Sequence, residues 1–109
     1  MGSRFVLVAS ADQYLFNLLA GNHEKILTSE RYTSRASALG GIAAVRANAP
    51  LETRYDRRTS RRGEPYFVLL AGNSEVIGTS EMYSSSSARD AGIGAVKANA
   101  ATAVLDDQT

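Results

Sequence analysis

The 109-residue sequence contains no cysteine and only one histidine. The absence of cysteine excludes disulfides and thiolate metal sites, and the lone His23 excludes a metal site built from paired histidines. An excess of charge of one sign is also missing, because twelve basic and eleven acidic side chains leave a formal net charge of +1. Such a balance gives no long-range field that would indicate a nucleic-acid or membrane partner.

Long apolar runs are absent as well. None approaches the ~20 residues that a membrane-spanning helix requires. The apolar residues 5–9 are too few and lie too near the start to form a signal peptide, and Val6 breaks the pattern for N-terminal myristoylation. We therefore expect a cytoplasmic protein. A composition of 44% hydrophobic and 21% charged residues is typical of a globular fold.

An internal repeat dominates what the sequence does contain. Residues 16–32 return with close similarity as residues 67–83, and residues 41–49 return as residues 92–100. The offset is constant at about fifty residues, the size at which repeats are whole supersecondary units. Two such copies in a short chain predict an internal pseudo-twofold, the covalent equivalent of a homodimer.

Alternating apolar residues and turn signals predict three strands and one helix in each copy. In the first copy we expect strands at residues 5–9, 15–20 and 25–30, then a helix that Ser34 caps and that ends near residue 47. The second copy is expected to have the same elements at residues 55–59, 66–71, 76–81 and 85–98, with a short closing strand at residues 103–105.

The apolar faces of these elements predict the core. Gly41 and Gly92 lie on the apolar helix faces, where glycine costs roughly 1 kcal/mol relative to alanine. Their presence in both copies predicts a close approach of another element, and simple tolerance is the alternative. Asn48 and Asn99 are expected to end the helices in a left-handed conformation. The predicted core residues are Phe16, Leu18, Ile42, Val45, Phe67, Leu69, Ile93 and Val96.

These motifs resemble the YegP-like family of small bacterial and archaeal proteins. The resemblance rests on residues 67–71, 75–85, 88–90 and 92–99, and it extends over nearly the whole chain. It implies an α+β fold of two tandem β-β-β-α(-β) repeats that share an antiparallel sheet, and it implies no reaction. We therefore expect a single pseudo-twofold symmetric domain over residues 1–109, with repeat one at about 4–50 and repeat two at about 54–105.

The chain departs from the family pattern at one turn of each repeat. The usual Asn-Gly pair is Asn22-His23 in repeat one and Asn73-Ser74 in repeat two. Asn-Gly suits a two-residue type I′ turn, which needs two residues with positive φ. Histidine and serine fit the second of these positions poorly, so we expect a longer loop that uses the preceding Gly21 and Gly72.

The most site-like feature is a Thr-Ser-Glu step followed by tyrosine, which occurs in both repeats. Hydroxyl, carboxylate and phenol groups gathered near a strand end could bind a polar ligand. Local capping and side-chain bonds to the backbone are the simpler interpretation of the same residues. The candidate ligand-binding residues are Thr28, Ser29, Glu30 and Tyr32 in repeat one, and Thr79, Ser80, Glu81 and Tyr83 in repeat two.

A basic segment is the second candidate site. Arginines that surround an aromatic side chain could hold phosphates and stack on a base of a nucleic acid. A charged edge strand that resists pairing with other chains is the alternative interpretation. The residues of this candidate nucleic-acid site are Arg54, Tyr55, Arg57, Arg58, Arg61 and Arg62.

Catalytic signals are weak. A serine or threonine nucleophile needs an oriented base beside it, but His23 lies in a predicted turn and is replaced by Ser74 in the other repeat. We predict no catalytic residues, no cofactor and no metal. The sequence favours a non-enzymatic binding or interaction module whose partner is a protein or a small ligand. A nucleic-acid-associated protein that uses residues 54–62 is the alternative, and no membrane partner is expected.

Overall fold

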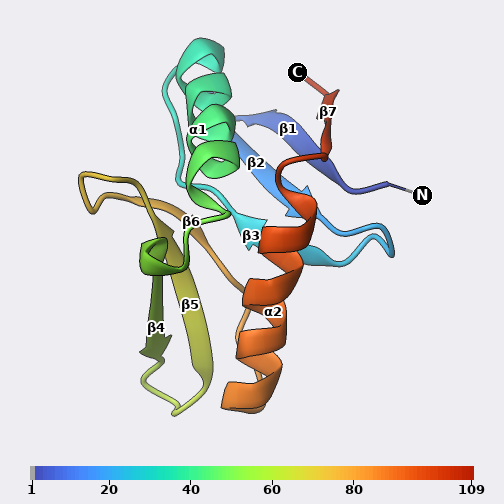
Figure 1. Cartoon of the computed structure of the whole chain (residues 1–109). Coiled ribbons are helices and arrows are strands. Elements are labelled where there is room, and N and C mark those ends of the chain that lie inside the picture. The colour runs from blue at the N-terminus through green and yellow to red at the C-terminus, as the bar shows by residue number, and fades with distance from the viewer. Residues whose placement is uncertain (1) are drawn as a thin grey trace.

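Each repeat folds into three antiparallel strands and one helix in the computed structural model, which describes residues 2–109 (Figure 1). Repeat one contains β1 (Arg4–Ser10), β2 (Gln13–Leu19), β3 (Lys25–Thr28) and α1 (Arg35–Asn48). A 3-10 turn at Glu52–Arg54 leads into repeat two. That repeat contains β4 (Tyr55–Thr59), β5 (Pro65–Leu70), β6 (Val76–Thr79), α2 (Ser86–Asn99) and the closing strand β7 (Val104–Asp107).

All strands join one seven-stranded sheet in the order β4-β5-β6-β3-β2-β1-β7. The first six of these strands form a palindrome about the β3–β6 boundary, where Thr28 pairs with Thr79. The expected antiparallel arrangement holds for β1 to β6. β7 differs because it runs parallel to β1, with Val104 beside Arg4 and Asp107 beside Leu7. The closing strand of repeat two therefore completes the sheet of repeat one.

The core occupies one face of this sheet. All eight residues predicted for the core are buried, from fully enclosed Phe16, Leu18 and Phe67 to Ile42 at 5% exposure. Strand residues of this face pack with both helices in a single cluster, so α1 and α2 cover the same side of the sheet (Figure 1). The opposite side carries no helix.

The helices begin as predicted and end differently. The Ser34 and Ser85 hydroxyls accept hydrogen bonds from the amides of Ser37 and Ala88, each at 3.0 Å. The expectation that Asn48 and Asn99 adopt a left-handed conformation is wrong, since both residues remain helical. Each asparagine amide instead donates to the carbonyl oxygen four residues earlier, at 2.8 and 2.7 Å. The backbone stays right-handed through the next residues, Ala49 and Ala100.

The β2–β3 and β5–β6 turns correct a second expectation. The loops are longer than two residues, but Gly21 and Gly72 do not take the left-handed conformation. His23 and Ser74 take it, with φ of 68° and 70°. The Ala20 carbonyl accepts a bond from the His23 amide at 2.9 Å, so the four-residue turn over residues 20–23 ends at the left-handed residue, as in three-residue hairpin loops.

Gly41 and Gly92 meet the close approach that their position predicts. A Cβ built at Gly41 would overlap the Tyr32 hydroxyl and lie 2.7 Å from Tyr32 Cζ. A Cβ at Gly92 would meet Tyr83 in the same way, 2.6 Å from its Cζ. The two tyrosines therefore require glycine on the helix faces above them. No helix within residues 2–109 is long and apolar enough to cross a membrane.

Candidate functional site

Ser29 and Ser80 extend the sheet through their side chains. The Ser29 hydroxyl accepts a hydrogen bond from the Phe16 amide at 2.9 Å and donates to the Glu30 carbonyl oxygen at 2.7 Å. The Ser80 hydroxyl makes the same two bonds, with the Phe67 amide at 3.0 Å and the Glu81 carbonyl at 2.8 Å. Each hydroxyl thus uses its proton and a lone pair to hold its own hairpin.

Thr28 and Thr79 are the candidate ligand residues that the structure brings together. They are paired neighbours at the boundary between the repeats. Thr28 donates to the Asn17 side-chain oxygen at 2.8 Å, and both threonines lie on the helix-free face because their strand partners alternate with the core residues. The next acidic residues, Glu30 and Glu81, are exposed.

Tyr32 and Tyr83 lie on the other side of the sheet, each within its own repeat. Tyr32 stacks on Phe16 with ring centroids 6.2 Å apart, and Tyr83 stacks on Phe67 at 6.4 Å. Burial raises the pKa of each phenol, and for Tyr32 the carboxylate of Glu30 raises it further. The sheet therefore separates the tyrosines from the threonines, and no pocket within residues 2–109 joins them.

The basic segment is divided between the two faces of β4. Arg57 points to the helix side, where it binds Glu52 at 2.9 Å and Asp90 at 3.1 Å. Arg58 points to the helix-free side and binds Asp56 at 2.9 Å. Alternation along the strand causes this division, so the two arginines do not present charge on one surface.

The remaining residues of the segment differ in exposure. Tyr55 is 7% exposed, packs on Phe67 and donates its hydroxyl proton to the Ala49 carbonyl at 2.7 Å. Its ring is therefore not available to stack on a base. Arg54 donates to the Asn48 side chain at 2.9 Å. Arg61 and Arg62 lie in the exposed β4–β5 turn, without an ion pair among the described residues.

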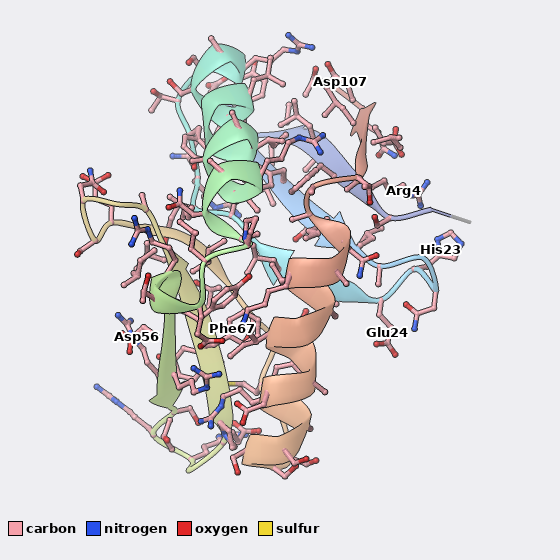
Figure 2. All side chains as sticks on the ribbon, in the orientation of Figure 1. Arg4, His23, Glu24, Asp56, Phe67 and Asp107 are labelled. Carbon is pink, nitrogen blue, oxygen red and sulfur yellow. The ribbon has the colours of Figure 1, made fainter. Side chains whose placement is uncertain are left out.

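His23 lies at the outer tip of the β2–β3 hairpin beside Glu24 (Figure 2). It is exposed, and no side-chain hydrogen bond within residues 2–109 orients its ring toward a serine or threonine. Within the same range, no group of three histidine, cysteine or acidic residues is arranged to hold a metal ion.

A helix-free apolar surface is the feature that sequence reasoning missed. We call it the outer face, and its aliphatic residues come from three strands. Val68 is 2% exposed although it lies outside the helix-covered core, and the others are partly exposed. Apolar residues at successive positions of β1, β2 and β5 were the available signal, because they place apolar side chains on both sides of a sheet. The outer face comprises Val6, Val8, Leu15, Leu19, Val68 and Leu70.

Strand register makes this surface continuous. Val6 lies beside Asn17, which lies beside Thr28, and the row continues across the boundary through Thr79 to Val68. The two candidate threonines therefore stand at the centre of the outer face. Asn17 separates Thr28 from Val6 on one side, and Val68 lies directly beside Thr79 on the other.

Comparison with known proteins identifies relatives over the full length. A model of a family described as a domain of unknown function (DUF1508) matches twice, at residues 9–56 and 60–107. A UPF0339 protein of Bordetella pertussis is 60% identical over 109 residues, which cover 100% of this chain and 98% of the relative. UPF0339 protein YegP of Escherichia coli K12 is 48% identical over 110 residues, with 100% of both chains covered.

Two solved structures share the fold. The solution structure of YegP from E. coli, a protein of unknown function, has a TM-score of 0.93 and covers 100% of this chain at 48% identity, with 95% of that chain covered. A UPF0339 protein from Shewanella oneidensis has a TM-score of 0.91 at 45% identity and covers 98% of this chain and 92% of its own. With two matches to the family model and full-length relatives at this identity, the chain belongs to the DUF1508 family, among the two-repeat UPF0339 proteins similar to YegP.

Proposed function

We propose that this chain is a non-enzymatic interaction module that binds a partner protein through the outer face. The observation that carries the proposal is the apolar character of a sheet face that no helix covers. An antiparallel sheet with one free side ordinarily presents polar residues there. Val6, Val8, Leu15 and Leu19 instead present aliphatic side chains on adjoining strands. These four side chains are partly exposed, and contiguous apolar surface that is accessible to a partner marks sites of interaction.

The polar groups of the outer face support a protein as the partner. Ion pairs stand around the aliphatic residues of the outer face, with Arg4–Asp106 at 3.4 Å, Arg58–Asp56 at 2.9 Å and Lys25–Glu81 at 3.6 Å. An apolar surface with a polar rim is common in protein interfaces. The hydroxyls of Thr28 and Thr79 supply hydrogen-bonding groups at the centre.

The other candidate ligand residues have supporting roles in this proposal. Ser29 and Ser80 hold the strands that present the threonines, and Tyr32 and Tyr83 hold the helices against the opposite face. Glu30 and Glu81 extend from the ends of β3 and β6, where their carboxylates can contact basic groups of the partner. A small polar ligand at the same threonines is a further candidate that the experiment below distinguishes by mass.

Site-specific photo-crosslinking tests the proposal. A photoreactive phenylalanine derivative replaces Leu15 or Val8 on the outer face, and Ala43, which is exposed on α1, is the matched control on the helix side. We expect a discrete protein adduct in the host bacterium at the outer-face positions and none at residue 43. Adducts of the same masses and yields at all three positions would contradict the proposal, and an adduct of small-molecule mass would assign the face to a ligand.

Nucleic-acid association through residues 54–62 is the alternative function. The exposure of Arg61 and Arg62 favours this function. The ion pairs of Arg57 and Arg58 speak against it, because a guanidinium that already binds a carboxylate binds a phosphate more weakly. A cytoplasmic location also stays a prediction, which fractionation of the host would test.

A further inference from the structure

Leu27 and Gly78 occupy equivalent positions in the two repeats but differ greatly in size. They pair with Leu18 and Leu69 respectively, so both face the core and flank the Thr28–Thr79 pair. The Leu27 side chain, which is 1% exposed, occupies the space above Gly78. A Cβ at Gly78 would lie 2.6 Å from Leu27 Cγ and 3.0 Å from its Cδ1. One repeat thus supplies a knob and the other supplies the hole that receives it.

Backbone pairing between β3 and β6 contributes little to the boundary at these two strands, which we call the seam, although β1 and β7 also join the repeats at the edge of the sheet. β3 and β6 pair through Thr28 and Thr79 alone, whereas β1 and β2 pair through seven residues each. Side chains therefore decide what fits across the seam. α1 packs over β5 and β6 of the other repeat, and α2 packs over β3. Each repeat covers apolar surface that the other repeat would otherwise expose.

Polar contacts between the repeats also have a fixed direction. Repeat one supplies the cation in each ion pair that joins residues 4–50 to residues 54–109. Lys25 binds Glu81, Arg4 binds Asp106, and Arg35 binds Asp107. Arg46 likewise donates to the Ala100 carbonyl oxygen at 3.0 Å. Two copies of repeat one placed against each other would lack Asp106 and Asp107, the carboxylates that bind Arg4 and Arg35.

We propose that the seam is an exchangeable docking surface whose second occupant is another copy of this chain. Repeat one of one molecule accepts repeat two of the second molecule, and the second molecule's repeat one accepts the first's repeat two. The exchange breaks the β1–β7 pairing, the Thr28–Thr79 pair and the helix contacts across the seam, and each of these forms again with the second molecule. The connection between α1 and β4 is the segment that takes a different conformation in the exchanged dimer. That connection contains Pro50 and the exposed Leu51, and hinge segments of this kind permit swapping of identical elements between protomers. Leu27, the space above Gly78, and the cations of repeat one that bind carboxylates of repeat two all favour the pairing of repeat one with repeat two.

Two complementary variants of the full-length chain test the exchange. Leu27→Gly leaves a hole on both sides of its own seam, and Gly78→Leu places a knob on both sides. A swapped dimer of the two variants restores one knob and one hole at each of its two seams. We expect the variants, unfolded together and refolded together, to give a one-to-one dimer in native mass spectrometry. The heterodimer should exceed either homodimer by more than about tenfold, because mismatched packing disfavours each homodimer.

Two controls isolate the seam. The double variant Leu27→Gly/Gly78→Leu matches within one chain and is expected to stay a folded monomer. Met82→Gly and Gly94→Leu change exposed positions outside the hinge, since Met82 is 44% exposed and a Cβ at Gly94 meets nothing within 4 Å, and their mixture should give no heterodimer excess.

The proposal is overturned if the seam variants give homodimers and heterodimers in statistical proportion. It is equally overturned if their mixture stays unfolded or monomeric while the double variant folds. Circular dichroism of the mixture and of the double variant reports which of these outcomes holds. Exchange goes beyond the outer-face function, since its readout is the mass of this chain's own assemblies and not the capture of a partner.

Discussion

Tyr32 lies so close to Gly41 that no other residue fits at that helix position without movement. The tyrosine ring is held from below by Phe16, on which it stacks with an interplanar angle of 12°. A side chain at residue 41 would therefore push against a ring that already packs on Phe16, and the ring or the helix would have to shift. Tyr83, Gly92 and Phe67 repeat the arrangement.

Substitution of neighbouring glycines in α1 tests this contact. Gly41→Ala should lower the free energy of unfolding by about 1–3 kcal/mol, the usual cost of overpacking. Gly40→Ala is the matched control, because a Cβ there meets nothing within 4 Å. It should stabilise the protein by up to about 1 kcal/mol through helix propensity. Urea denaturation measures both, and equal effects of the two substitutions would contradict the packing described above.

Removal of the bridging serine hydroxyls should destabilise the hairpins. Ser80→Ala leaves the buried Phe67 amide without its acceptor, which should cost about 1–3 kcal/mol. Ser87→Ala removes an exposed hydroxyl that makes no hydrogen bond within residues 2–109, and it is the control. Thermal unfolding followed by circular dichroism compares them. A melting temperature for Ser80→Ala equal to that of the control would show that water replaces the bond.

Stability should depend on pH through Asp107. The Thr109 hydroxyl and then the Arg35 guanidinium lower the pKa of Asp107 from 3.8 to about 2. Because the folded pKa is the lower one, the carboxylate stabilises the fold above pH 4 and loses this contribution as the pH falls toward 2. The difference in urea midpoint between the parent and Asp107→Asn should therefore narrow over this window. A constant difference from pH 5 to pH 2 would contradict this linkage.

The basic segment should not act as a nucleic-acid site. We expect the parent chain to bind short single-stranded RNA weakly, and the double variant Arg58→Gln/Arg62→Gln to bind it equally. If these arginines do contact phosphates, the affinity of the parent falls steeply with salt, and the variant loses about one unit of slope for each lost contact. Fluorescence anisotropy at several salt concentrations distinguishes the two results. Tight and salt-sensitive binding by the parent that the variant loses would reverse our choice of function.

Much of the fold follows from the sequence because the repeat doubles each signal. The capping serines, the core faces and the pairing of strands within each repeat all appear twice in equivalent places. Predictions failed where a local preference competes with an alternative bond. Asn48 by itself favours a left-handed helix end. In the structure its side-chain amide donates to the Ala44 carbonyl oxygen, and the residue remains helical. His23 adopts the left-handed conformation less readily than glycine would, but the turn over residues 20–23 requires this conformation at its last position.

The candidate site is less predictable, because its relationships join distant parts of the chain. The pattern at Gly41 indicated a close approach but gave no partner, since Tyr32 reaches it only after the chain turns between β3 and α1. The outer face depends on which of two apolar strand faces the helices cover, and periodicity alone does not decide this. The parallel pairing of β7 with β1 depends on where the chain lies after the end of α2.

The parallel pairing of β1 with β7 determines how the molecule bears mechanical load. β1 begins near the N-terminus and β7 ends near the C-terminus, and the two strands point in the same direction. A force that pulls the termini apart therefore acts along both strands in opposite senses and shears their bonds together. The bonds from Val104 to Ser3 and from Gln108 to Leu7 carry that load jointly with the Arg35–Asp107 ion pair. The strand that breaks the symmetry of the sheet is thus the clamp that resists extension.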